Sequence, residues 1–227
     1  MASLVHPSLL GTAMMRKLVT EFIGTFFLVL TIGLTVVGGS DFAPLAIGSV
    51  LMVMVYMGGH ISGAHYNPAV SLAMLIRGRM DAKEFGPYVG VQILGAFIAA
   101  WVVYMAMGET LDVAPAPSTG LVPFLLLEVL FTFALALVIL NVATAKATEG
   151  NSYFGLAIGF TVLVGVFAVG GITGGAFNPA VAIGPIVADA VFGDSSSLAE
   201  LWVYVLANFV GGALAAVVFK FQNPEDV

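Results

Sequence analysis

The stretch that decides the fold, Gly59-His-Ile-Ser-Gly-Ala-His-Tyr-Asn-Pro-Ala-Val70, recurs later in the chain as Gly170-Gly-Ile-Thr-Gly-Gly-Ala-Phe-Asn-Pro-Ala-Val181. In each copy a glycine-rich run ends in Asn-Pro-Ala. Asparagine is a favourable helix N-cap and proline suits the first helical position, so helices are predicted to begin at Pro68 and Pro179. Their apolar continuations are too short to cross a bilayer, which takes roughly 20 residues. Each copy therefore predicts irregular backbone that leads into a half-length helix.

The composition places the chain in a membrane. Of its 227 residues, 60% are hydrophobic and only 9% are charged, whereas about a quarter are charged in soluble domains. The absence of cysteine excludes disulfides, thiolate metal sites and cysteine nucleophiles. There is no basic stripe for nucleic acid and no catalytic constellation. We therefore expect a lipid bilayer as the surroundings, no metal, no cofactor and no enzymatic activity.

The chain follows one plan twice: a span, a shortened span, a half-length helix and a further span. The predicted spans cover residues 18–37, 42–57, 87–107, 121–142, 154–169 and 198–219. Because each copy holds an odd number of spans, the second copy must be inverted relative to the first. The predicted fold class is an all-α membrane protein with six transmembrane helices and two re-entrant half-helices.

This plan divides the chain into two repeats. The first repeat takes residues 18–107 and the second takes residues 121–219, with a connecting loop at 108–120 between them. Residues 1–17 and 220–227 are expected to be cytoplasmic tails.

The basic residues predict the orientation. With the N-terminus inside, all of them fall on the cytoplasmic side, namely Arg16, Lys17, Arg77, Arg79, Lys83, Lys146 and Lys220. The outer loops carry acidic residues instead. This distribution obeys the positive-inside rule, so both termini are predicted to be cytoplasmic, and we expect the plasma (inner) membrane.

Inversion brings the two half-helix starts together near the midplane, at Asn67 and Asn178. Irregular backbone at that depth must be buried in protein or line a wet cavity, and such paired segments mark the functional site of an inverted repeat. Two positive helix ends would repel cations and hydrated protons there. The asparagine amides can donate hydrogen bonds, and acceptors are expected at the carbonyls of Gly63, Ala64, His65, Gly174, Gly175 and Ala176. This arrangement suits a file of small neutral molecules.

Two boxes, Asn67-Pro68-Ala69 and Asn178-Pro179-Ala180, on six predicted spans resemble the aquaporin (major intrinsic protein) family. The resemblance covers residues 16–219. It implies a homotetramer with one pore per subunit, and a narrow outer filter formed by Ile47, Val166, Gly175 and the residue after the second box. Most members have arginine at that last position, whereas this chain has Val181.

The missing arginine affects which solutes we expect the pore to conduct. Its loss removes a fixed positive charge and fork-like donors, and some plant vacuolar members that resemble this chain in carrying valine pass small neutral solutes besides water. We predict a passive channel for water, with ammonia, hydrogen peroxide and urea as further solutes. Glycerol or another polyol is the alternative, although the glycerol-conducting branch commonly has aspartate where this chain has Ala182.

Two other classes of transport protein are alternatives to a passive channel. A secondary active transporter also uses inverted repeats with broken helices, but no titratable cluster accompanies Asn67 and Asn178. The other class is an ion channel, since loss of the filter arginine leaves room for a minor ion leak. The apolar filter and the two positive helix ends make ion flow costly.

Two acidic residues, Glu21 and Glu128, lie inside predicted spans, each in the pattern Glu-x-x-x-Thr. An ionisable residue in a span is a functional candidate, and a proton relay is one interpretation. Their matching places favour a structural role, in which each carboxylate accepts hydrogen bonds from the exposed backbone of a re-entrant loop. His60 and His65 are candidate pH sensors, but structural or pore-wall roles are favoured, with His65 at the inner mouth.

Overall fold

The computed structural model describes residues 7–194 and 197–226, and within them the chain forms eight α-helices. In chain order they are α1 (Pro7–Val37), α2 (Ala43–Ser62), α3 (Pro68–Arg77), α4 (Ala82–Met107), α5 (Leu121–Thr144), α6 (Phe154–Thr173), α7 (Pro179–Phe192) and α8 (Leu201–Gln222). Short 3₁₀ turns occur at Lys146–Thr148, Leu198–Glu200 and Pro224–Asp226.

Six of these helices are long and apolar enough to cross a membrane, namely α1, α2, α4, α5, α6 and α8. The other two, α3 and α7, have 10 and 14 residues and are too short to span alone. This confirms the predicted fold class of six spans and two half-helices.

The structure corrects several predicted boundaries. The second and fifth spans are not shortened, because α2 continues through Gly58-Gly59 to Ser62, and α6 continues to Thr173. A helix at membrane depth satisfies its own backbone hydrogen bonds, which outweighs the low helix propensity of glycine. Each helix ends only where Gly63 or Gly174 adopts a left-handed conformation, with φ of 87° and 85°.

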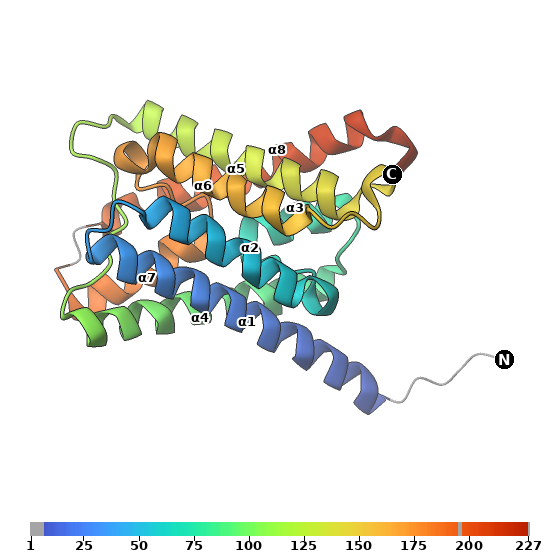
Figure 1. The fold of residues 1–227 in the computed structure, drawn as a ribbon, viewed down its shortest axis with the longest axis horizontal. Coiled ribbons are helices and arrows are strands. Elements are labelled where there is room, and N and C mark those ends of the chain that lie inside the picture. Colours follow the sequence, from blue (N-terminus) through green and yellow to red (C-terminus); the bar gives the residue numbers. More distant parts are fainter. Residues whose placement is uncertain (1–6, 195–196, 227) are drawn as a thin grey trace.

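Helices continue into both segments that were predicted as cytoplasmic tails. Residues 7–17 belong to helix α1, and α8 extends beyond the predicted end of the last span to Gln222. Residues 1–6 and 227 lie outside the described residues. The helices in Figure 1 lie roughly side by side along the long axis of the molecule, with the polar connections gathered at its two ends.

Each half-helix packs against the last span of the opposite repeat: α3 lies on α8, and α7 lies on α4. Glycines permit this close approach. A Cβ on Gly212 of α8 would lie 2.5 Å from the carbonyl oxygen of Ala69, and a Cβ on Gly184 of α7 would lie 2.5 Å from Cβ of Ala96. The two repeats are thus interlocked, so that each holds the short helix of the other.

Candidate channel pore

The asparagine of each box caps its own half-helix. Asn67 has an extended backbone, and its Oδ1 accepts hydrogen bonds from the N–H groups of Ala69 at 2.8 Å and Val70 at 3.4 Å. Oδ1 of Asn178 accepts from the N–H of Ala180 at 2.9 Å. Because the oxygen is turned to the helix, the amide nitrogen of each side chain points away from it.

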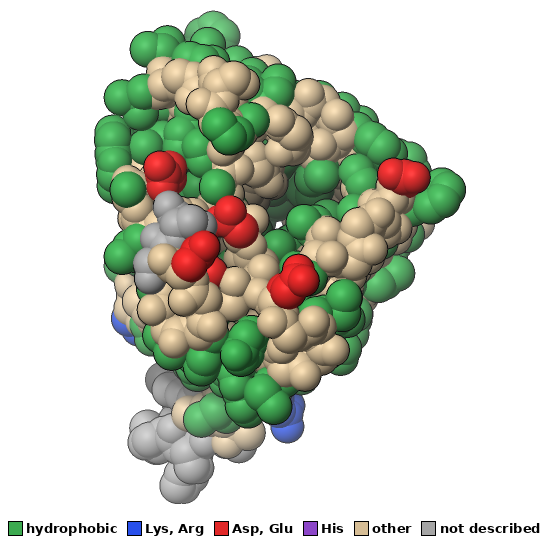
Figure 2. All heavy atoms as spheres, turned by 90° about the vertical axis from the view of Figure 1, so that its left-hand side faces the viewer, with side chains coloured by type: hydrophobic (Ala, Val, Ile, Leu, Met, Phe, Trp, Pro, Cys, Tyr) green, Lys and Arg blue, Asp and Glu red, His purple; other side chains and the backbone are tan. Residues whose placement is uncertain are grey.

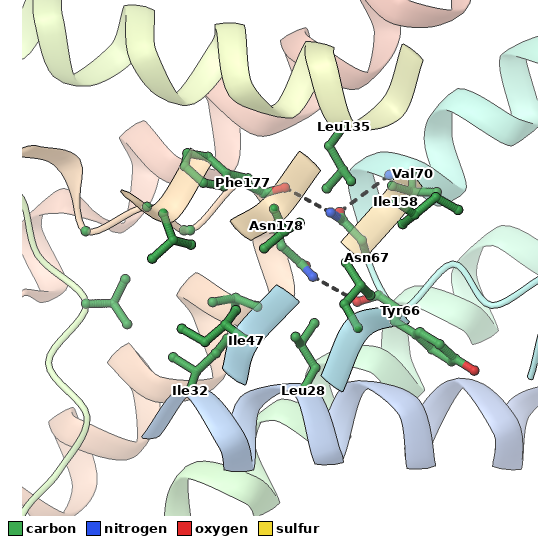
Figure 3. Close-up of a pocket in the computed structure, with 18 of the residues that line it drawn as sticks. Leu28, Ile32, Ile47, Tyr66, Asn67, Val70, Leu135, Ile158, Phe177 and Asn178 are labelled. Atoms are coloured by element: carbon green, nitrogen blue, oxygen red, sulfur yellow. Dashed lines mark hydrogen bonds between the residues drawn. The ribbon is translucent and has the colours of Figure 1, made fainter. Parts of the chain in front are cut away.

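Those amide nitrogens join the two half-helices to each other. Nδ2 of Asn67 donates to the carbonyl of Phe177 at 2.9 Å, and Nδ2 of Asn178 donates to the carbonyl of Tyr66 at 2.8 Å (Figure 3). The bonds are reciprocal, as an inverted repeat requires. A primary amide has two N–H hydrogens, so each asparagine keeps one donor beyond the cross-link.

Glu21 holds the irregular backbone before the first box. Its Oε1 accepts from Oγ of Ser62 at 2.7 Å and from the N–H of His65 at 3.0 Å. Its Oε2 accepts from the N–H of Tyr66 at 2.7 Å and from Nε2 of Gln92 at 2.8 Å. The carboxylate is fully buried, and all of these partners belong to the loop or its supporting helices.

Glu128 does the same for the second box. It accepts hydrogen bonds from Oγ1 of Thr173 at 2.7 Å, the N–H of Ala176 at 3.2 Å, the N–H of Phe177 at 2.9 Å and Nδ2 of Asn208 at 2.9 Å. The two glutamates therefore act as matching anchors for the two loops. The sequence pattern had not revealed that Gln92 and Asn208 orient them.

The anchored loops contain unusual backbone. Tyr66 and Phe177 have φ of 50° and 49°, and Ala64 also has φ of 50°. Residues other than glycine rarely adopt this left-handed conformation, which costs on the order of 1–3 kcal/mol each. Tyr66 and Phe177 donate their N–H groups to the glutamates and their carbonyls accept from the asparagines. This backbone is thus held from both sides at the midplane.

A narrow cavity of about 80 Å³ passes the asparagine pair. The predicted filter residues and most of the predicted carbonyl residues line it, namely Ile47, Val166, Gly175, Val181, Ala64, His65, Gly174 and Ala176. The rest of its wall is chiefly apolar and was not predicted from the sequence; it includes Leu28, Ile32, Leu51, Val70, Leu135, Ile139, Ile158 and Val162. Several of these side chains surround the asparagines in Figure 3.

The narrow cavity continues into a wider one of about 700 Å³ at the end of the molecule that carries Lys17 and Lys146. The two cavities share Ala64, His65, Ile139 and Ile158 in their walls. Gly63 lines only the wider cavity, together with His60. His65 therefore stands where the two cavities meet, and its Nδ1 lies 3.0 Å from Oγ of Ser71.

At the opposite end, the connecting loop folds inward to form the mouth of the narrow cavity. Leu111 and Val113 are buried, and both line the narrow cavity with Asp112 between them. The N–H of Ala116 donates to the carbonyl of Ile172 at 2.9 Å and so ties the loop to the end of α6. Figure 2 looks onto this end and shows carboxylates around a central hollow.

An inverted repeat with two half-helices that meet on a continuous cavity defines the architecture of a transmembrane channel. Comparison of the chain with known protein families agrees with this geometry, because the model of the major intrinsic protein family matches residues 8–219. The chain therefore belongs to the major intrinsic protein, or aquaporin, family of passive channels, and it is a multi-pass integral membrane protein.

The relatives include proteins named as a glycerol uptake facilitator and as aquaporins. The chain is similar to Glycerol uptake facilitator protein-like 6 of Lactiplantibacillus plantarum, with 40% identity over 93% of this chain and 100% of the relative. It is also similar to Aquaporin NIP1-1 of Zea mays, with 37% identity over 92% of this chain and 76% of the relative. The structure is similar to the X-ray structure of the aquaglyceroporin from Plasmodium falciparum, with a TM-score of 0.81 and 25% sequence identity. The match covers 93% of this chain and 98% of the aquaglyceroporin.

Proposed function

We propose that this chain conducts water and other small neutral solutes, with ammonia, hydrogen peroxide and urea as candidates, and that it excludes ions and protons. The observation that carries the proposal is the reciprocal pair of hydrogen bonds between the two boxes, located on a cavity that continues into the inner vestibule. It places the N-terminal ends of two half-helices, and two spare amide donors, at one point of the path.

Cation exclusion follows from this meeting point. The N-terminal end of a helix carries roughly half a positive charge, so a cation at the asparagines would face two such ends. The side chains around the asparagines, such as Leu28, Leu135 and Ile158, are apolar (Figure 3) and offer no ligands to replace its hydration shell. A water molecule can instead accept from an asparagine amide and pass on between the backbone carbonyls of the two loops. We expect neutral molecules to pass and ions to be rejected.

The outer filter supports small, weakly polar solutes. Ile47, Val166 and Val181 contribute only hydrocarbon side chains, and Gly175 contributes none. A solute at this point makes its hydrogen bonds with backbone carbonyls and with neighbouring solvent. We expect ammonia, hydrogen peroxide and urea to pass on this basis, because each is neutral and small.

Glycerol is the second candidate, because a relative with 40% identity is named a glycerol uptake facilitator protein-like protein. A polyol must exchange the hydration of several hydroxyls for hydrogen bonds within the pore. The filter side chains supply no such partners, and the following residue is Ala182. We therefore place glycerol permeability below that of water and urea.

A coupled transporter would need a site for its coupling ion. The described residues that line the narrow cavity include three with titratable side chains, His65, Tyr66 and Asp112. Among the described residues there is no group of three or more His, Cys, Asp or Glu side chains that could hold a metal ion. These observations favour passive flow.

The topology and assembly are part of the proposal. We place both termini in the cytoplasm, because the predicted inner side collects all the basic residues, and we assign the plasma (inner) membrane. The wider cavity is then the cytoplasmic vestibule. We further propose a homotetramer with one pore in each subunit, as the family resemblance implies.

Proteoliposomes in a stopped-flow osmotic assay test the proposal. Vesicles with the protein should shrink faster than empty vesicles, and a Val181→Trp variant should return them to the empty rate by filling the filter. Val217→Trp is the matched control, because Val217 is 60% exposed on α8. Water flux no greater than in empty vesicles would contradict the proposal, and solute uptake that collapses with an uncoupler would support a transporter instead.

A further inference from the structure

The carboxy-terminal turn is bound to the cytoplasmic end of the bundle through Asp226. After α8 the chain turns back through Pro224–Asp226, and the Asp226 side chain is only 8% exposed. Its Oδ2 accepts from the N–H of Lys146 at 2.8 Å, and its Oδ1 lies 3.7 Å from Nζ of the same lysine. Nζ of Lys146 also donates to the carbonyl of Glu225 at 2.6 Å. Figure 1 shows this end of the chain beside the connection between α5 and α6.

The same carboxylate faces a buried cation. Arg77 is the last residue of half-helix α3, and its side chain is 4% exposed. Its Nη2 lies 3.7 Å from Oδ2 of Asp226, and its guanidinium lies 4.7 Å above the ring of Phe219. Within the described residues, Nε and Nη2 have no hydrogen-bond partner. A buried cation without a counter-ion is strongly unfavourable. Asp226 therefore stabilises the end of α3 directly, as the counter-ion of Arg77.

Half-helix α3 connects this contact to the pore. It has 10 residues, which corresponds to a rigid rod of about 15 Å. Asn67 caps the pore end of the rod, and Arg77 ends it at the cytoplasmic side. A change in how Arg77 is held would be transmitted along this rod to the Asn67 amide and its bond to Phe177.

The connection that Asp226 holds through Lys146 is also part of the rim of the vestibule. Nη2 of Arg79 donates to the carbonyl of Thr144 at 3.2 Å, just before Lys146. Arg79, Thr144 and Lys146 all line the wide cavity. Asp226 thus joins three parts of the inner mouth: the end of α3, the connection between α5 and α6, and the end of α8.

We propose that Asp226 is a positioning residue for conduction, which acts through Arg77 to fix α3 and so the Asn67 amide in the pore. The inference rests on the proposed channel function. A plain structural role would lower the number of folded channels and leave each remaining channel unchanged. A positioning role changes the properties of each channel.

The test compares Asp226→Asn with Asp226→Glu, which keeps the charge, and with Glu225→Gln. Glu225 is exposed and contributes its carbonyl to Lys146, so its side chain serves as the matched control. The readout is the activation energy of water flow in proteoliposomes together with the ratio of urea to water permeability. Once the flux through empty vesicles is subtracted, both quantities are independent of how many channels are active.

For Asp226→Asn we expect the permeability ratio to change by about threefold, a size typical of coupling between linked sites, together with a higher activation energy. Hydrogen exchange should rise at residues 68–79 and 144–151 and remain unchanged in α2 and α6. Asp226→Glu should keep the permeability ratio and the activation energy close to the wild-type values, and Glu225→Gln should match the wild type.

An unchanged ratio and activation energy, or faster exchange confined to the last residues of α8 and the turn, would overturn the inference. If Asp226→Asn does not assemble, Arg77→Lys retains the charge but shortens its reach, and the same outcomes apply. If the wild type conducts no water, the proposed function fails, and hydrogen exchange at residues 68–79 alone decides whether Asp226 positions α3.

Discussion

Replacement of Glu128 tests whether the buried carboxylate supports the second re-entrant loop or relays protons. In Glu128→Gln, an NH2 group takes the place of one carboxylate oxygen. If its nitrogen faces Thr173, that hydroxyl can rotate to accept, but the N–H of Ala176 loses its acceptor. A buried donor left unpaired costs about 1–3 kcal/mol. The isosteric variant should therefore be measurably destabilised but folded.

Glu128→Leu removes every acceptor at once. The N–H groups of Ala176 and Phe177 then lose their acceptor, and so does one N–H of the Asn208 amide, which keeps its second bond to Thr132. Three unpaired donors amount to about 3–9 kcal/mol at the same cost for each group. That is comparable to the whole free energy of unfolding of a typical domain, about 5–15 kcal/mol. We expect this variant to lose the left-handed backbone at Phe177 and with it the acceptor of Asn67.

The assay is the free energy of unfolding in mixed micelles, measured beside water permeability for each channel. Glu149→Gln is the control for the loss of one carboxylate, because Glu149 is exposed. The reasoning is refuted if Glu128→Leu unfolds with the wild-type free energy and conducts water at the wild-type rate. A proton current that disappears in Glu128→Gln while the fold is unchanged would favour the relay.

Three further predictions concern the boxes and the filter. Asn178→Asp replaces the donor to Tyr66 by an oxygen 2.8 Å from a carbonyl, so we expect a loss of about 1–3 kcal/mol of stability and a cation leak in planar bilayers; Asn141→Asp, outside the pore, should show no leak. Gly212→Val places a side chain 2.5 Å from the Ala69 carbonyl and should cost about 1–3 kcal/mol and reduce water flux, whereas Gly90→Val on α4 meets nothing within 4 Å and should conduct normally. Val181→Arg adds a charge and donors to the filter, so urea and ammonia fluxes measured in vesicles should fall relative to water, and an unchanged ratio would place the selective constriction elsewhere.

The duplicated Asn-Pro-Ala element made most of the fold predictable. Asparagine and proline are local signals for a helix start, and the structure begins α3 at Pro68 and α7 at Pro179. The odd number of spans then required inversion. The boundaries at Gly58-Gly59 and Gly170-Gly171 were wrong, because glycine propensity is a local signal, whereas a helix in a membrane is sustained by the need to pair its own backbone.

The candidate site was predictable only where a residue carries chemistry that stands out from its surroundings. A glutamate in a span is such a residue, and the structure has the backbone hydrogen bonds that were predicted for Glu21 and Glu128. Leucine and isoleucine on the pore wall resemble those that face lipid, so Leu28 and Ile158 gave no signal. The contact between Asp226 and Arg77 joins residues far apart in the sequence, and no local pattern indicates it.

The two determinants of the proposed selectivity occupy different parts of the chain. In this proposal, ion rejection comes from the two helix ends at Asn67 and Asn178, which are held by the cross-links and the buried glutamates. Solute choice is assigned to the side chains of the proposed outer filter, where Val181 is the first residue after the second box. Because Val181 makes none of the hydrogen bonds that align the asparagines, the filter can lose its arginine without moving the barrier to ions. A change in solute range is therefore compatible with a sealed membrane, and the two properties should separate in variants of Val181 and Asn178.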